Sequence, residues 1–419
     1  MNAEHCKAYT LLQEQQIDDI HAHGYLLRHN KSGARVLLLE NEDDNKVFNI
    51  AFRTPPADST GVAHILEHSV LCGSREFPLK DPFVELVKGS LNTFLNAMTY
   101  PDKTMYPVAS TNDADFQNLM HVYMDAVFYP NIYKHDEIFR QEGWSYHLES
   151  KDGPLTYNGV VYNEMKGAFS SADDVLERET FNTLFPDTPY GVESGGDPSC
   201  IPNLTYENFL KFHQTYYHPS NSYIYLYGDM DMTEKLRWLD EEYLGKYDRK
   251  EIDSEIQIQK KFKEPIEREI FYSVSESESL DHATYLSINT QAGNELSPKE
   301  YVAFQILEYV LLDAPGAPLK KALLDAGIGD DIMGGYEYGI LQPYFSVIAK
   351  NAEREQKDEF VKIVKAELKK LADGGIDKKC LKAGINNYEF QYREADYGST
   401  PKGLMYGLQC LDSWLYGGD

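Results

Sequence analysis

The sequence has no apolar run that could cross a membrane, because its longest apolar stretches are far shorter than the ~18–20 residues that a transmembrane helix needs. Residues 1–20 lack the apolar core of a signal peptide and the Arg- and Ser-rich amphipathic pattern of a transit peptide. We therefore expect a protein without a membrane segment and a cytoplasmic location, or an organellar location if a targeting segment has been removed.

Cysteine is also scarce, with five residues scattered over 419 positions and no C-x-x-C pair. Neither a disulfide framework nor a cysteine-based zinc site is therefore supported. Positive charge is low too, since 40 Lys and Arg residues face 67 Asp and Glu residues and leave a net charge of −27. Such a surface repels nucleic acid and anionic lipid, so neither is an expected partner. The charge indicates either a generic acidic surface or a cavity that favours cationic peptides.

The sequence does contain an H-x-x-E-H motif, His64-Ile65-Leu66-Glu67-His68. On a helix, His64 and His68 project from one face about one turn apart. Two imidazole nitrogens at that spacing can reach one tetrahedral zinc ion at roughly 2.0–2.1 Å each. Glu67 lies beside that face and can take a proton from the attacking water. This order of residues is the inverted zincin signature.

A pattern with three fixed positions also arises by chance, but the flanking sequence favours a docked helix. A strand-like run at 47–52 precedes the motif, and Asp58-Ser59-Thr60-Gly61 supplies N-cap candidates and a turn. A catalytic zinc site needs three protein ligands, so one more ligand must come from elsewhere in the chain. Spacing alone does not single it out among 67 acidic residues.

The chain is too long for one core, and its length favours two domains of about 200 residues each. Strand patterns at 22–29, 34–41 and 46–53 precede the motif, a helical stripe covers 112–129, and another helix is predicted at 135–149. We predict an α+β fold with a catalytic zinc-binding domain, a charged linker and a second domain, at 1–246, 247–268 and 269–419.

The second part of the chain repeats the first with its metal ligands lost. When Ile306-Leu307-Glu308 is aligned with Ile65-Leu66-Glu67, Gln305 replaces His64 and Tyr309 replaces His68. Strand–helix alternation can look alike by chance, but the shared Ile-Leu-Glu favours a duplication. At the spacing between Glu67 and Glu308, a complete second unit would extend past residue 419. We therefore expect the second domain to be incomplete.

Three segments resemble the presequence protease branch of the pitrilysin, or inverzincin, family of zinc metallopeptidases. They are His-Ile-Leu-Glu-His-Ser-Val-Leu-Cys-Gly-Ser at 64–74, Leu-Asn-Thr-Phe-Leu-Asn-Ala-Met-Thr at 91–99 and Gly-Val-Val-Tyr-Asn-Glu-Met-Lys-Gly at 159–167. The resemblance covers essentially the whole chain. It implies the N-terminal half of such an enzyme, built of two related α/β-roll domains that enclose peptide substrates together with a C-terminal half.

The same resemblance assigns the site residues by position. It implies one Zn²⁺ per chain held by His64, His68 and Glu164, with Glu67 as the base that passes the water proton to the leaving amine. Asn96 and Ala97 match an edge strand that pairs with the substrate backbone. Four further residues match positions that line the pocket beside the zinc, although ordinary core packing explains each equally well: Leu71, Phe83, Val84 and Val87.

The expected function is a zinc-dependent endopeptidase that hydrolyses unstructured peptides, including cationic ones. One alternative is a processing-peptidase-type subunit that needs a partner chain. Another is a non-catalytic peptide-binding or scaffold subunit. The intact set of four metal-site residues argues against the scaffold, because an inactive relative usually loses one of them, as the second repeat has.

Overall fold

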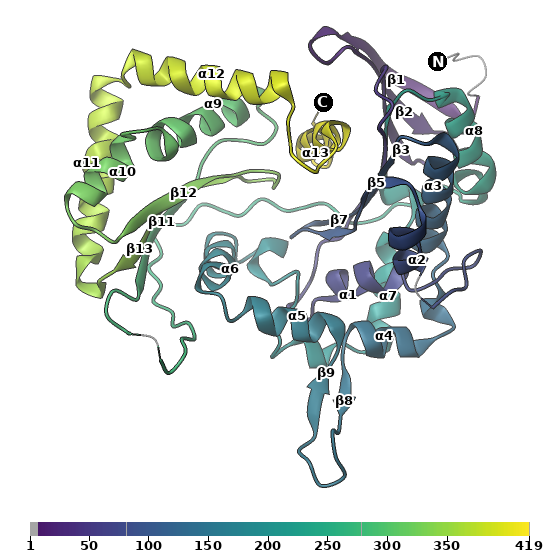
Figure 1. The fold of residues 1–419 in the computed structure, drawn as a ribbon, viewed down its shortest axis with the longest axis horizontal. Helices are drawn as coiled ribbons and strands as arrows, with labels where there is room; N and C mark the ends of the chain where they lie inside the picture. The colour runs from purple at the N-terminus through teal and green to yellow at the C-terminus, as the bar shows by residue number, and fades with distance from the viewer. Residues whose placement is uncertain (1–6, 81, 278, 419) are drawn as a thin grey trace. The chain divides into compact units, whose positions relative to one another are not determined.

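The structure, a computed structural model, describes residues 7–80, 82–277 and 279–418. Within these residues the chain divides into two units (Figure 1). The first comprises Met1–Gln257 with Tyr397–Cys410, and the second comprises Ile258–Asp396 with Leu411–Asp419. Each contains a mostly antiparallel sheet packed with helices, which confirms the predicted α+β class. The functional division into two domains and a linker stays a prediction.

The sheet of the first unit contains strands in the order β1 (Tyr9–Ile17), β2 (Ala22–His29), β3 (Arg35–Glu40), β10 (Ser222–Gly228), β4 (Lys46–Arg53), β7 (Lys103–Ser110) and β5 (Asn92–Leu95). Neighbouring strands are antiparallel except β3 and β10. In β4, Phe48 and Ile50 join a core of helices, whereas Val47 joins a second cluster that includes Leu404 of α13 (Lys402–Trp414). Since strand residues alternate between the two faces, packing on both faces explains the continuous apolar run of β4.

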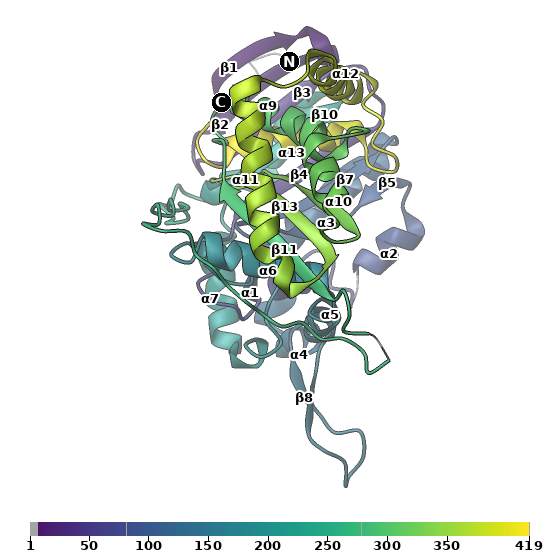
Figure 2. The same ribbon diagram turned by 90° about the vertical axis from the view of Figure 1, so that its left-hand side faces the viewer.

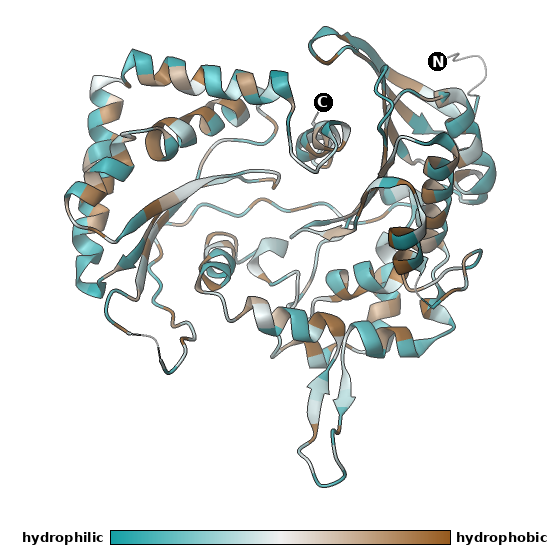
Figure 3. Cartoon of the chain, in the orientation of Figure 1, coloured by the Kyte–Doolittle hydropathy of each residue, from teal (hydrophilic) through white to brown (hydrophobic). Residues whose placement is uncertain are grey.

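Apart from α6, the helices α1 to α8 contribute apolar residues to the core beside this sheet, and Figure 3 shows both brown and teal residues along them. The helical stripe predicted at 112–129 is confirmed as α3, whose N-cap residue Asn112 accepts a hydrogen bond from the Asp115 backbone. The bounds are α1 (Val62–Val70), α2 (Pro82–Gly89), α3 (Asp113–Phe128), α4 (Asp136–Glu142), α5 (Val160–Ala168), α6 (Ala172–Leu184), α7 (Tyr206–Tyr216) and α8 (Met232–Glu242).

The prediction of a helix at 135–149 is wrong for the second half of that range. Helix α4 ends at Glu142, and the chain then forms a hairpin of β8 (Ser145–His147) and β9 (Thr156–Asn158). A Cβ at Gly143 would lie 2.8 Å from the carbonyl oxygen of Phe139, and the indole of Trp144 donates to the Leu204 carbonyl instead of continuing the helix. The hairpin extends away from the surrounding helices in both views (Figures 1 and 2).

The second unit repeats the element order of the first. Its strand β11 (Thr284–Gln291) pairs with β13 (Tyr344–Ala352), which pairs with β12 (Asp331–Glu337), just as β4 pairs with β7 and β7 with β5. Helix α9 holds the place of α1, and the Glu308 carboxylate accepts the Tyr336 backbone N–H at 3.1 Å. The helices are α9 (Pro298–Glu308), continued by a π-helical turn at Tyr309–Asp313, α10 (Pro318–Asp325), α11 (Lys357–Gly374) and α12 (Lys378–Glu394).

Length and hydropathy also bear on membrane insertion. Among the helices in the described part of the chain, none combines the length and the apolar character that a membrane crossing requires.

Candidate active site

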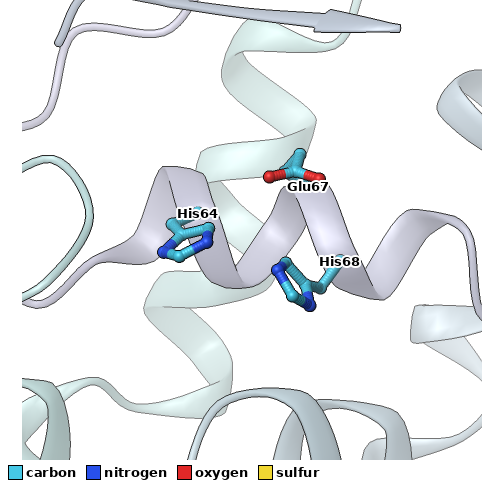
Figure 4. Close-up of side chains that lie close together, drawn as sticks. All are labelled: His64, Glu67 and His68. Atoms are coloured by element: carbon cyan, nitrogen blue, oxygen red, sulfur yellow. The ribbon is translucent and has the colours of Figure 1, made fainter. Parts of the chain in front are cut away.

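Helix α1 carries the H-x-x-E-H motif, and Figure 4 shows His64, Glu67 and His68 projecting from it. The helix is buried on nearly every side, so its position is set by core packing. It begins after Gly61, which adopts a left-handed conformation (φ 69°) that glycine takes without steric cost. A Cβ at this position would lie 2.7 Å from the Gly195 carbonyl oxygen. The glycine therefore allows two backbone segments to meet at the start of the motif helix.

The two histidines are each held at Nδ1 by a different acceptor. Nδ1 of His64 lies 3.0 Å from the Gly195 carbonyl oxygen, and Nδ1 of His68 lies 3.4 Å from Oε2 of Glu142. A carbonyl oxygen can only accept, so Nδ1 of His64 carries the proton and its Nε2 keeps a free lone pair. The carboxylate favours the same tautomer for His68. Both Nε2 atoms are thereby available as metal ligands.

The two Nε2 atoms converge on Glu164 of α5. Its Oε2 atom lies 3.8 Å from Nε2 of His64 and 3.7 Å from Nε2 of His68. Ligand atoms around a tetrahedral zinc ion lie about 3.3 Å apart. Small side-chain rotations would close that difference, so these three residues fit a zinc ion. On α5, Val161 and Met165 are buried, whereas Val160 and Glu164 are exposed.

Glu67 is a second carboxylate near the histidines, since its ligand atom and theirs all lie within 4.8 Å of one another. Unlike Glu164, it is buried, and it accepts a hydrogen bond from Oγ1 of Thr99 at 3.3 Å. Burial raises the pKa of the Glu67 carboxyl, against opposing effects of His68 and Thr99. A carboxyl group with a raised pKa suits proton transfer near neutral pH.

Burial and neighbouring charges affect the two histidines in opposite directions. Burial lowers the pKa of His64, and the charge of His68 adds to this effect, which favours the neutral imidazole that binds metals. Burial also disfavours the charged form of His68, but the hydrogen bond that its Nδ1 donates to Glu142 and the charges of Glu67, Glu142 and Glu164 raise its pKa overall. A metal ion must therefore compete with a proton mainly at His68.

A pocket of about 640 Å³ opens over these side chains. Its lining contains no lysine or arginine among the described residues, but it contains four glutamates: Glu67, Glu142, Glu164 and Glu193. The potential inside such a pocket is negative, which attracts cationic groups of a ligand. The acidic character of the chain thus extends into the pocket beside the histidines.

The structure brings most of the predicted substrate-binding residues to this pocket. Asn96, Ala97, Leu71, Phe83 and Val84 are part of the lining. Val87 of α2, which is 54% exposed, is not part of it. Sequence reasoning missed Thr99, Glu142, Glu193 and Gly195. A Gly-Gly pair such as Gly195-Gly196 is a turn signal, but no pattern in the sequence shows that this turn contacts His64.

The edge of the sheet beside the pocket has an interruption between β5 and β6 (Met98–Thr99). There the Asn96 N–H donates to the Pro107 carbonyl at 3.3 Å, and the Asn96 carbonyl accepts from the Tyr123 hydroxyl at 3.1 Å. Both backbone groups of Asn96 are thus used inside the protein.

Comparisons with known proteins agree with this fold. Residues 53–152 match the family model "Insulinase (Peptidase family M16)", and residues 203–388 match "Peptidase M16 inactive domain". Protein HypA of Clostridium perfringens (strain 13 / Type A) is 56% identical over 98% of this chain and 42% of its own length. Presequence protease 1, chloroplastic/mitochondrial, of Arabidopsis thaliana is 44% identical over 97% of this chain and 38% of its own length.

A solved structure shares the fold. The crystal structure of pitrilysin matches 98% of this chain and 44% of that chain, with a TM-score of 0.67 and 18% sequence identity. The chain belongs to the M16, pitrilysin-like, peptidase family, so the family predicted from the motifs is confirmed. It spans about two fifths of the length of the curated relatives it matches.

Proposed function

We propose that this chain is the zinc-binding part of a metalloendopeptidase that hydrolyses unstructured peptides. The observation that carries the proposal is the convergence of Nε2 of His64, Nε2 of His68 and Oε2 of Glu164, with Glu67 beside them. Histidine and carboxylate ligands of this kind are typical of catalytic zinc sites that leave one position open. Membership of a peptidase family and a presequence protease relative support the same activity.

The proposed mechanism divides the work among four side chains. His64, His68 and Glu164 would hold the zinc ion, which when bound supplies Lewis-acid polarisation of the scissile carbonyl and an acidified water. Glu67 accepts the proton of the attacking water and delivers it to the leaving amine. Thr99 holds the Glu67 carboxylate toward the pocket through its hydroxyl.

The substrate would bind as an added strand along the sheet edge. The backbone N–H and carbonyl of Ala97 would pair with the peptide main chain, which recognises extended peptides of many sequences. Four glutamates in the pocket would favour peptides with cationic side chains. The relatives span more than twice the length of this chain, so we propose that a C-terminal half completes the enzyme.

Location and alternative roles remain proposals. We propose a cytoplasmic location, or an organellar one as in the Arabidopsis relative, which is named for chloroplasts and mitochondria. A non-catalytic peptide-binding subunit would retain the pocket and the edge strand but would not cleave peptides. A processing-peptidase-type subunit would require a separate partner chain.

Metal removal tests the proposed activity. We expect this chain, fused to the part of the C. perfringens relative that it does not match, to cleave an unstructured basic peptide. Treatment with 1,10-phenanthroline should abolish cleavage, and addition of one equivalent of Zn²⁺ should restore it, because the metal polarises the scissile carbonyl. Cleavage is followed by mass spectrometry of the fragments. Full activity after verified metal removal would contradict a zinc peptidase.

Backbone methylation of the substrate tests the strand-like binding mode. In the non-cleaving Glu67→Gln variant, methylating the peptide amide that pairs with the Ala97 carbonyl should weaken binding by roughly 2–10-fold, the usual contribution of one hydrogen bond. Methylation of the adjacent amides should have little effect, because these amides point away from the edge. Fluorescence anisotropy of a labelled peptide series measures this pattern. An equal loss at every position would argue against strand addition.

A further inference from the structure

A short segment from Glu193 to Asp197 forms one wall of the pocket and lies against the start of α1. Within it, the Gly195 carbonyl accepts the Nδ1 proton of His64 at 3.0 Å. The N–H of the same residue, Gly195, donates to Oε1 of Glu193, also at 3.0 Å. A carboxylate, a backbone glycine and an imidazole are thus connected in one chain of hydrogen bonds that ends at a candidate metal ligand.

Ser59 anchors this segment on both sides of Gly195. The Glu193 N–H donates to Oγ of Ser59 at 3.1 Å, and the Asp197 N–H donates to the Ser59 carbonyl at 2.8 Å. Gly61 lies so close to Gly195 that no side chain fits between them. The loop that precedes the motif helix and the Glu193–Asp197 segment therefore form one unit, within which the side chain of Glu193 fixes the Gly195 N–H.

We propose that Glu193 is a positioning residue for metal binding. By holding the N–H of Gly195, its carboxylate orients the Gly195 carbonyl, which keeps the proton of His64 on Nδ1 and directs Nε2 toward the metal. Outer-shell partners of metal-binding histidines act in this way by fixing the tautomer and the orientation of the ring. The inference rests on the proposed zinc site, and it adds to that site a residue whose carboxylate is not itself a metal ligand.

The proposed positioning role requires a hydrogen-bond acceptor on the side chain of residue 193, but it does not require a negative charge there. Glutamine retains the Oε1 acceptor, whereas alanine removes it. Glu177 provides a matched control. Its negative charge acts on Glu193, but the acceptor of the Gly195 N–H is Glu193 and not Glu177. The variants Glu193→Gln, Glu193→Ala and Glu177→Ala therefore separate the hydrogen bond from the local charge.

The test measures zinc affinity by competition with a chromogenic chelator, together with the visible absorption spectrum of the Co²⁺-substituted chain. We expect Glu193→Ala to bind zinc about 10–100-fold more weakly than wild type, the usual effect of losing an outer-shell partner, and to shift the Co²⁺ bands. Glu193→Gln and Glu177→Ala should match wild type in both measurements. Wild-type affinity in Glu193→Ala, or an equal loss in Glu193→Gln, would overturn the positioning role while leaving the zinc site intact.

A wild-type chain that binds no zinc would instead refute the proposed function itself, so the two failures are distinguishable. A second measurement does not depend on any variant at residue 193. Long-range ¹H–¹⁵N spectra of metal-free wild type, with His64 assigned by comparison with His64→Gln, should show the proton on Nδ1. A proton on Nε2 would overturn the inference even if Glu193→Ala failed to fold.

Discussion

Replacing Glu67 with glutamine will abolish peptide hydrolysis and leave zinc bound. The amide has nearly the shape of the carboxylate and can still accept the hydrogen bond from Thr99, but it cannot take a proton from water. Loss of a general base typically costs about 10²–10⁴-fold in rate. Glu67 is assigned both the uptake of the water proton and its delivery to the leaving amine, so we expect the upper part of that range.

The zinc content of Glu67→Gln also decides which carboxylate is the ligand. Glu67 and Glu164 both lie near the two histidines: one Glu164 oxygen lies within 3.8 Å of both Nε2 atoms, and one Glu67 oxygen lies within 4.8 Å of a ring nitrogen of each histidine. Metal analysis should therefore find wild-type zinc in Glu67→Gln and reduced zinc in Glu164→Gln. The control for both measurements is Glu85→Gln, which makes the same substitution at an exposed residue of α2. If Glu67→Gln lost zinc and Glu164→Gln kept it, Glu67 would be the metal ligand and Glu164 the base.

The parts of this site that lie close together in the sequence could be predicted from it. Helical periodicity places His64 and His68 on one face, and the flanking strand-like run indicated β4 correctly. Glu164 was assigned only through resemblance to a family, because nothing in a pattern of acidic residues reveals which one the fold carries to a distant helix. The structure brings its carboxylate to both histidines.

Other parts could not be predicted, for physical reasons that differ. The Gly195 carbonyl is a backbone group that nearly any residue would provide, so its contact with His64 cannot be predicted from the residue type at position 195. Glu142 is the last residue of α4, whereas the hydrophobic periodicity predicted a helix that continues to residue 149. The helix ends where the backbone of Gly143 lies close to the Phe139 carbonyl, and this contact cannot be read from the sequence. Strand β1 was missed since it is a mostly polar, exposed edge strand whose pairing with β2 is decided by the sheet.

Replacing His68 with alanine will remove zinc binding and also destabilise the fold. The substitution deletes one of three ligands, so zinc affinity should fall by more than the about 10–100-fold that an outer-shell change costs. It also leaves the buried Glu142 carboxylate without the imidazole that lies 3.4 Å away. A buried polar group without its partner typically costs about 1–3 kcal/mol. Chelator competition measures the affinity, and urea unfolding of the metal-free chain measures the stability.

The double variant His68→Ala, Glu142→Ala separates these two effects. Removing the Glu142 carboxylate, which has lost its imidazole partner, should restore part of the lost stability. Zinc affinity should stay as low as in His68→Ala. His135→Ala, which removes an exposed imidazole, should leave both quantities at their wild-type values. Equal zinc affinity in wild type and His68→Ala would mean that the ion binds elsewhere. The two imidazoles would then have a structural role only, because a zinc site that they form cannot lose one of its ligands without losing affinity.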